Sequence, residues 1–214
     1  RVRSSAASDV YKRQDHIVSH GIFGTSCEIH MDGELIRAEI KVPGQHQVTN
    51  TLAAVRVAKL LGLDMEQMTR GIASVVPIAG RNRIIQEGNF TLIDDCYNAN
   101  PVSMKAALDL LSLADTRKVA ILGDMFELGE NSDMLHSGVG CYAKGKTDLL
   151  ICIGENAKHI YDGAKEAGVA HIYHFTDKES FLREKENLLQ AGDTILLKAS
   201  HGMAFETLIS QLLH

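Results

Sequence analysis

The pattern of apolar and polar positions divides the chain into two parts. In the first part, two β-rich runs at 24–30 and 35–42 flank an Asp32-Gly33 pair, which predicts a β-hairpin. Periodic segments at 46–61 and 64–75 then predict two helices. We expect the first helix to bury a stripe made of Ala53, Val57, Leu60 and Leu61, and Asp64 to cap the second. A change of pattern places a domain boundary near residues 80–83.

From this boundary onward, strands and helices alternate. The predicted strands are 82–86, 90–94, 118–122, 149–153, 171–175 and 194–197, and the predicted helices are 101–113, 132–144, 156–167, 177–190 and 202–213. Asn100 before Pro101 marks one helix start, and Thr176 with Glu179 has the spacing of a capping box. Apolar strands that alternate with amphipathic helices predict an α/β fold with a mostly parallel sheet covered on both faces.

Composition is that of a folded protein with little basic surface. The chain has 214 residues, of which 45% are hydrophobic and 23% charged. It has no apolar run near 18 residues, so we expect no membrane span. The net charge of −5 argues against a nucleic-acid partner. Four cysteines without a CxxC pair indicate reduced thiols rather than disulfides or a zinc site; they are Cys27, Cys96, Cys141 and Cys152.

Residues 1–14 have no useful period and are small, polar and basic. The segment resembles a translated adapter-derived tail, and the alternative is a disordered N-terminal extension. We therefore leave it out of the fold prediction. Because it holds four basic residues and one acidic residue, the rest of the chain carries about −8. The remaining sequence begins at Asp15 without an initiator Met, which suggests a fragment of a longer protein.

Three polar segments follow predicted strands, at 94–101, 123–130 and 198–202. Ligands of open parallel sheets bind beyond the carboxyl ends of the strands, so these segments are candidate binding loops. They supply the candidate substrate-binding residues, which are Asn98, Asn100, Asp124, Glu127, Lys198 and Ser200. The alternative is that these residues serve only as turns and helix caps.

Two apparent motifs do not fit their context. Residues 140–147 match the phosphate-loop pattern G-x-x-x-x-G-K-[ST], but a predicted helix precedes them and a predicted strand follows. A phosphate loop needs the opposite order, so we interpret Gly145 as the end of a helix. His171 and His174 lie in a strand pattern at a spacing that places them on opposite faces, so we assign no metal ligands.

Four strings in order and spacing resemble the C-terminal half of the Mur ligases. They are GQHQVTN at 44–50, AGR at 79–81, DDCYNANP at 94–101 and LGDMFELGE at 122–130. The resemblance covers about residues 15–214. It implies that 15–80 form the end of the central ATP-binding domain and that 81–214 form a Rossmann-like C-terminal domain. The last two strings point to the branch of the family that adds D-Ala-D-Ala to UDP-MurNAc-tripeptide during peptidoglycan precursor synthesis.

The resemblance also implies a reaction and roles for individual residues. In the family, ATP phosphorylates the tripeptide carboxylate, the dipeptide amine attacks the acyl phosphate, and phosphate leaves. By similarity, Asn50 lies by the adenine, Arg81 reaches the ATP phosphates and Asp95 accepts hydrogen bonds from the ribose. His46 belongs to the same motif as Asn50, and we take Arg81 and His46 as the candidate catalytic residues. The alternative for His46 and Asn50, four residues apart, is a capping pair.

The cofactors implied are ATP and Mg²⁺, whose ligands lie mostly upstream of this chain. The implied parent is a monomeric cytoplasmic enzyme, and without the upstream phosphate loop we expect the fragment alone to be inactive. Two alternatives remain open. One is another amide ligase of the superfamily, such as a different Mur ligase or a folylpolyglutamate synthase. The other is a free-standing nucleotide-binding module.

Overall fold

A computed structural model describes residues 12–44 and 46–213, and for residues 12–14 and 46 it describes the backbone alone. The described chain divides into two compact units, which meet between Pro77 and Ile78. This division lies a few residues before the boundary expected from the sequence. Each unit is described by itself below.

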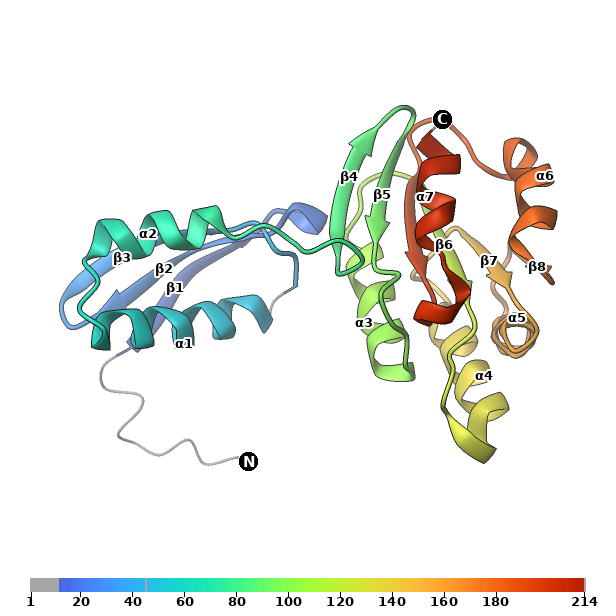
Figure 1. Cartoon of the computed structure of the whole chain (residues 1–214), viewed down its shortest axis with the longest axis horizontal. Coiled ribbons are helices and arrows are strands. Elements are labelled where there is room, and N and C mark those ends of the chain that lie inside the picture. Colours follow the sequence, from blue (N-terminus) through green and yellow to red (C-terminus); the bar gives the residue numbers. More distant parts are fainter. Residues whose placement is uncertain (1–11, 45, 214) are drawn as a thin grey trace. The chain divides into compact units, whose positions relative to one another are not determined.

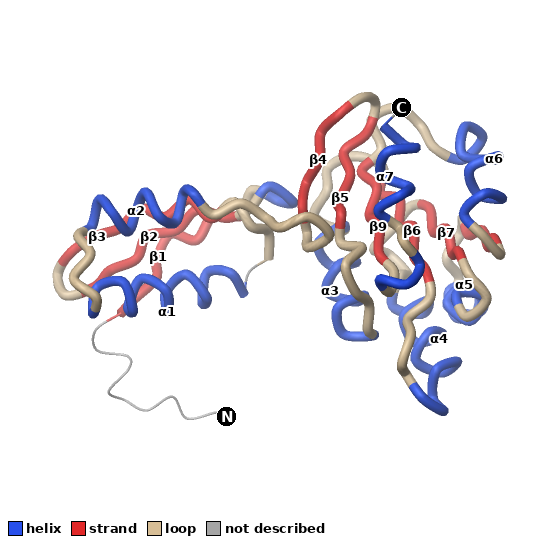
Figure 2. Tube along the Cα trace, viewed as in Figure 1, coloured by secondary structure: helices blue, strands red, loops and turns tan. Residues whose placement is uncertain are grey.

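Unit 1 is a three-stranded antiparallel sheet with two helices (Figures 1 and 2). Its elements are β1 (Lys12–Ser19), the short 3-10 helix η1 (Gly21–Phe23), β2 (Thr25–Met31), β3 (Glu34–Ile40), α1 (His46–Leu60) and α2 (Met65–Ser74). Alternate residues of β2 and β3 face a core to which Val48 and Val55 of α1 and Met68 of α2 contribute. Both helices therefore cover the same face of the sheet.

Local signals in unit 1 agree with the structure at the turns. Asp32 and Gly33 have φ angles of 52° and 82°, so the predicted hairpin turn requires left-handed backbone at both positions. Asp64 caps α2 by accepting a hydrogen bond from Gln67 N–H at 2.8 Å. These two predictions are confirmed.

Two expectations for unit 1 are wrong. The stripe predicted to be buried on α1 is exposed: Val57, Leu60 and Leu61 are 56%, 73% and 75% exposed, and Ala53 is also exposed. The helix is apolar on more than one side, and the sheet packs against the side that carries Val48 and Val55. The sequence prediction also left residues 1–14 out of the fold, yet β1 begins at Lys12 and residues 12–14 pair with β2. Residues 1–11 lie outside the described chain.

Unit 2 is a six-stranded sheet in the order β4-β5-β9-β6-β7-β8. Only β4 runs antiparallel, and the other strands pair in parallel. The strands are β4 (Arg83–Glu87), β5 (Phe90–Asp94), β6 (Lys118–Gly123), β7 (Leu149–Ile153), β8 (Ile172–Phe175) and β9 (Thr194–Lys198). The prediction of an α/β fold with a mostly parallel sheet is confirmed.

Helices cover both faces of this sheet (Figure 1). They are α3 (Pro101–Leu111), α4 (Ser132–Tyr142), α5 (Ala157–Ala167), α6 (Lys178–Leu188) and α7 (Glu206–Leu213), with the 3-10 turns η2 (Gly129–Asn131) and η3 (His201–Met203). One core joins α6 and α7 to the sheet. It includes Phe181 of α6 and Phe205, which directly precedes α7, and both are fully buried. The helices α3, α4 and α5 lie on the other face.

The helix starts in unit 2 follow capping chemistry, with one correction. Asn100 caps α3 and Pro101 is its first residue, as predicted. The proposed box of Thr176 with Glu179 is wrong, because Asp177 is the cap and accepts from Ser180 N–H at 2.7 Å. The last predicted helix also begins later, at Glu206, because Ala204 has a left-handed φ of 48° after η3.

Candidate functional site

The three polar loops predicted as binding loops come together in unit 2. They follow β5, β6 and β9, which are neighbours in the parallel part of the sheet in the order β5-β9-β6. Hydrogen bonds join them: Ser200 N–H donates to the Asp124 carbonyl at 3.0 Å, and Phe126 N–H donates to Ser200 Oγ at 2.8 Å. The convergence expected at the carboxyl edge is therefore present.

Lys198 is the buried centre of this edge. Its side chain is only 2% exposed, and its ammonium forms an ion pair with Asp95 Oδ2 at 2.6 Å. The same group donates to the Asn98 carbonyl at 2.9 Å and to the Asp95 carbonyl at 3.3 Å. The three protons of an ammonium are thus used within the fold. Lys198, predicted to bind substrate, holds the 95–98 loop in place here.

Asp95 is held from two sides. Its Oδ1 accepts from Asn82 N–H at 3.3 Å and its Oδ2 accepts from Lys198, while its side chain is 12% exposed. Burial raises the pKa of Asp95, against the attraction of the Lys198 ammonium, because the charged form loses solvation in this site. Each carboxylate oxygen keeps a second lone pair, so its geometry permits a further donor.

Asp94, which the sequence analysis did not select, organises the start of the same loop. It is 1% exposed, forms an ion pair with Arg83 at 3.0 Å and accepts from Gly80 N–H at 2.9 Å. The buried Cys96 thiol donates to its other oxygen at 2.9 Å. Burial and this hydrogen bond raise the pKa of Cys96, so it stays a thiol. The adjacent Asp-Asp pair was visible in the sequence, but which partners each of the two carboxylates binds depends on the sheet register.

Arg81 lies on an exposed aromatic ring. Its guanidinium carbon is 4.4 Å from the centre of the Tyr97 ring, and the His201 ring lies 5.7 Å from Tyr97. Gly80 makes this approach possible: a Cβ at Gly80 would come within 3.0 Å of Tyr97 Cβ and 3.1 Å of its backbone nitrogen. The exposed Arg81 thus occupies a defined place on the loop. Tyr97 and His201 were within the predicted loops but were not selected there.

Asp124 and Ser200 are buried, and their side chains form hydrogen bonds within unit 2. Asp124 Oδ1 accepts from Ala157 N–H at 2.6 Å, so it caps the start of α5 from another loop. Ser200 Oγ accepts from Phe126 N–H, as described above.

His136, which the sequence analysis missed, accepts from Met125 N–H through Nε2 and contacts the Ser132 carbonyl through Nδ1 at 2.8 Å. Because a backbone N–H can only donate, Nδ1 carries the proton of the neutral ring.

The remaining candidates in unit 2 are exposed. Asn98 accepts from its neighbour Ala99 N–H, and Asn100 accepts from Ser103 N–H as the cap of α3. Glu127 has a left-handed φ of 62°, a conformation that costs free energy for a residue with a side chain. Of these three, Asn98 and Glu127 present side chains that are not used to cap a helix.

Two candidates belong to unit 1. Asn50 is exposed on α1, and its amide donates to Gln47 Oε1 at 3.1 Å. This partner is not His46, so the bond does not test the His46–Asn50 capping pair that was the alternative to a nucleotide role. His46 begins α1, and its side chain lies outside the described part of the structure. The roles of both residues stay predictions.

The G-x-x-x-x-G-K-T string has the order expected of a helix end. α4 ends at Tyr142, Gly145 has a φ of 73°, and β7 begins at Leu149. Lys146 contacts the Asp109 carboxylate at 2.6 Å, and Thr147 Oγ1 donates to the Lys118 carbonyl. This segment is not a phosphate loop, as the sequence indicated.

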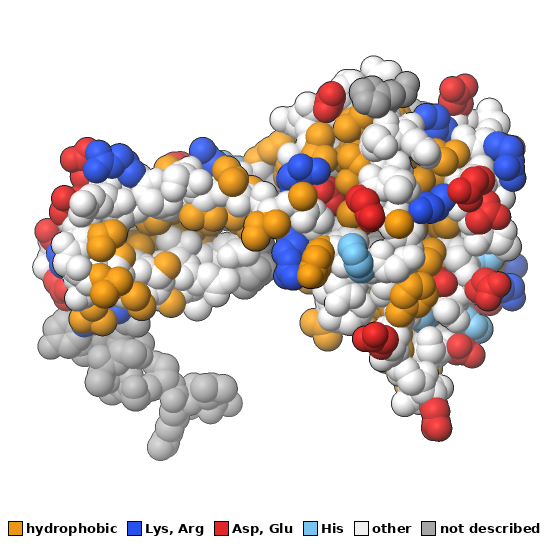
Figure 3. Space-filling view, viewed as in Figure 1, with side chains coloured by type: hydrophobic (Ala, Val, Ile, Leu, Met, Phe, Trp, Pro, Cys, Tyr) orange, Lys and Arg blue, Asp and Glu red, His pale blue; other side chains and the backbone are white. Residues whose placement is uncertain are grey.

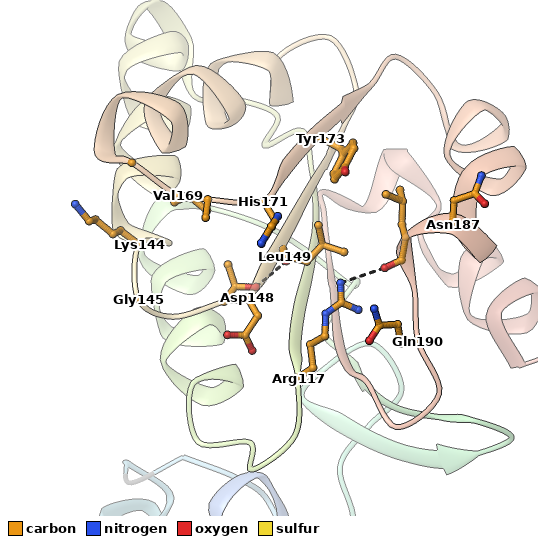
Figure 4. A pocket seen from close by; sticks show the side chains of 14 residues that line it. Arg117, Lys144, Gly145, Asp148, Leu149, Val169, His171, Tyr173, Asn187 and Gln190 are labelled. Atoms are coloured by element: carbon orange, nitrogen blue, oxygen red, sulfur yellow. Dashed lines mark hydrogen bonds between the residues drawn. The ribbon is translucent and has the colours of Figure 1, made fainter.

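An open pocket of about 860 Å³ lies near this segment, at the amino ends of β7 and β8 (Figure 4). Parallel strands place this edge opposite the three loops. Its Arg117 guanidinium is held by Asp193 at 2.9 Å and by the Leu188 carbonyl at 3.2 Å. None of the candidate residues selected from the sequence lines the pocket.

Within the described residues, no three His, Cys, Asp or Glu side chains gather into a set that could hold a metal ion. In the same part of the chain, no helix is long and apolar enough to cross a membrane. The four cysteines are free thiols.

A mostly parallel α/β sheet with helices on both faces and polar loops gathered at its carboxyl edge defines a domain of the doubly wound α/β class. Residues 80–201 match the family described as Mur ligase, glutamate ligase domain. The chain belongs to the Mur ligase family.

Relatives that are named UDP-N-acetylmuramoyl-tripeptide--D-alanyl-D-alanine ligase resemble most of the chain. The one from Escherichia coli is 32% identical over 213 residues, which are 98% of this chain and 45% of that protein. The one from Bacillus subtilis is 31% identical over 179 residues, which are 81% of this chain and 39% of that protein. A crystal structure of MurF from Acinetobacter baumannii has a TM-score of 0.85 at 28% identity and covers 94% of this chain and 45% of that one. The chain thus spans less than half the length of these relatives.

Proposed function

We propose that the chain is the C-terminal part of an ATP-dependent ligase that joins D-Ala-D-Ala to the tripeptide of UDP-MurNAc-tripeptide. The observation that carries this proposal is the convergence of the 94–101, 123–130 and 198–202 segments at one edge of the sheet, with Arg81 exposed on Tyr97 beside them. The named activity of the relatives supports the choice of substrates. The proposed setting is the cytoplasm, where ATP is available, and the proposed parent is a monomer.

In this proposal the residues divide into those that contact reactants and those that position them. The exposed Arg81 binds the negatively charged ATP phosphates, because a guanidinium stays charged and offers a planar set of donors. By family resemblance, Asp95 of unit 2 accepts hydrogen bonds from the ribose. The same resemblance gives Asn50 of unit 1 a role by the adenine, and His46 belongs to the same motif as Asn50. Asn98 and Glu127 face the incoming dipeptide. Lys198, Ser200, Asp124 and Asn100 act through the backbone that they hold.

The chemistry is the activation of a carboxylate. ATP transfers its terminal phosphoryl group to the tripeptide carboxylate and leaves as ADP. The dipeptide amine then attacks the acyl carbon and loses a proton as the amide forms, and phosphate leaves with the electrons of the broken C–O bond. ATP, which Mg²⁺ accompanies, supplies the leaving group. The described residues present Arg81 for the phosphates but no cluster of metal ligands, so we assign no ligand to the Mg²⁺ here.

The test compares this polypeptide with the complete ligase encoded by its gene. Given ATP, UDP-MurNAc-tripeptide and D-Ala-D-Ala, we expect the complete ligase to form the pentapeptide and to reject single amino acids such as glutamate. We expect the 214-residue chain alone to release no phosphate above the blank, because its only phosphate-loop pattern ends a helix. Glutamate addition by the complete ligase would contradict the assigned substrate, and turnover by the chain alone would contradict the assigned division of labour.

A further inference from the structure

We propose that Phe126 determines substrate specificity by packing its ring against the methyl side chains of the incoming dipeptide. This inference rests on the proposed function and adds the residue that distinguishes D-Ala-D-Ala from smaller dipeptides. Phe126 lies in the loop after β6, at the carboxyl edge where ligands of such sheets bind. Its ring is an apolar group that the fold displays rather than buries, since the residue is 42% exposed.

The backbone of Phe126 is held by a hydrogen bond, and the residue that follows it is conformationally strained. Its N–H donates to Ser200 Oγ at 2.8 Å, and Ser200 is itself buried and donates to the Asp124 carbonyl. The next residue, Glu127, is kept at a φ of 62°. Strained backbone of this kind persists where the surrounding structure fixes it, and it is concentrated at functional sites. The backbone that carries the exposed ring is therefore fixed to the loop after β9.

Gly202 lies directly against one edge of the Phe126 ring. A Cβ built at Gly202 would lie 2.9 Å from Phe126 Cε2 and 3.4 Å from Cδ2, so a side chain there would displace the ring. One edge of the ring thus lies against bare backbone from the loop after β9. The exposed part of the ring remains available to a ligand, and it suits small aliphatic groups because it offers no hydrogen-bond donor or acceptor.

The chemistry of the dipeptide gives a direct probe of this contact. Gly-Gly has the same amine, peptide bond and carboxylate as D-Ala-D-Ala but lacks both methyl groups. A contact between Phe126 and these methyl groups would stabilise D-Ala-D-Ala alone. Loss of the ring would then remove the preference for D-Ala-D-Ala and leave the use of Gly-Gly unchanged.

The experiment measures kcat/KM for D-Ala-D-Ala and for Gly-Gly with the complete ligase. In the wild type we expect a preference of about tenfold for D-Ala-D-Ala, the size typical of apolar discrimination by one or two methyl groups. Phe126→Ala should bring the ratio close to one, and Phe126→Leu should retain an intermediate preference. Val102→Ala is the control, because Val102 is 79% exposed near the same edge but lies in α3 and not in the three loops.

Each outcome separates the two proposals. If the wild type does not ligate D-Ala-D-Ala, the proposed function fails. If it does ligate D-Ala-D-Ala and Phe126→Ala keeps the wild-type ratio, or lowers kcat/KM equally for both dipeptides, the role of Phe126 is wrong and the proposed function stands.

Discussion

Gly140→Ala is expected to destabilise unit 2 by about 3 kcal/mol, near the upper end for overpacking of a core. A Cβ at Gly140 would lie 1.9 Å from the Ile160 carbonyl oxygen and 2.8 Å from the Ala164 nitrogen. Both atoms are backbone of α5, so they cannot move aside as a flexible side chain can. α4 and α5 would have to separate, and this pair makes the most extensive helix–helix contact of the described chain.

Gly138→Ala is the matched control, because it lies on the same helix and its Cβ would meet nothing within 4 Å. Alanine favours helix over glycine by roughly 1 kcal/mol, so this variant should be neutral or slightly more stable. Urea unfolding followed by tyrosine fluorescence measures both, since four of the five tyrosines lie in unit 2. Equal stabilities of the two variants would show that the close contact between α4 and α5 does not exist.

The same glycine shows how far the sequence could predict this region. Gly140 is the first residue of the phosphate-loop pattern, but the helical period before it and the apolar strand after it indicated the correct interpretation. What the sequence could not reveal is why glycine stands there. The reason is the backbone of α5, about 20 residues away in the chain, and periodicity gives no information about which helices touch.

In unit 1, the helical period was visible in the sequence but did not identify the buried side of α1. The apolar residues of α1 do follow a helical period, but they occupy more than one side, and the sequence prediction chose the side that the sheet leaves exposed. A periodic pattern identifies an amphipathic helix when only one side is apolar. Strand β1 was missed because its residues, KRQDHIVS, are mostly polar, and its place is set by pairing with β2 rather than by burial.

The candidate site was predicted at the level of loops and less well at the level of side chains. The rule for carboxyl ends of parallel strands placed all three loops correctly. It could not distinguish residues that face a ligand from residues that hold the loop, since Lys, Asp, Asn and Ser are typical of both. Lys198 and Ser200 have partners on neighbouring loops, which depend on the register of β5, β9 and β6. Asp124 has its partner at the start of α5. The cap that Asn100 forms is local, and the sequence predicted it.

Lys198→Met should cost unit 2 about 3–5 kcal/mol, because it removes one partner of a buried ion pair and leaves the Asp95 carboxylate uncompensated. The control is Lys158→Met, which breaks the Lys158–Asp162 pair in α5. Its side chains are 63% and 46% exposed, so its loss should cost no more than about 0.5 kcal/mol. If both variants lose the same stability in urea unfolding, the burial of the Lys198–Asp95 pair has no energetic consequence.

The double variant Lys198→Met/Asp95→Asn and a pH series identify the cause. If the loss comes from the uncompensated charge, the double variant recovers more than half of it, since no buried anion remains.

Burial already raises the pKa of Asp95 above its ordinary 3.8, and without Lys198 the pKa rises further. The folded state of Lys198→Met then binds a proton more tightly than the unfolded state. The stability deficit of Lys198→Met relative to the wild type should therefore be smallest below pH 3.8. It should grow as the pH rises through the pKa of Asp95 in the folded variant. A deficit that is the same at pH 4 and pH 8, with no recovery in the double variant, would mean that Lys198 stabilises the site by packing alone.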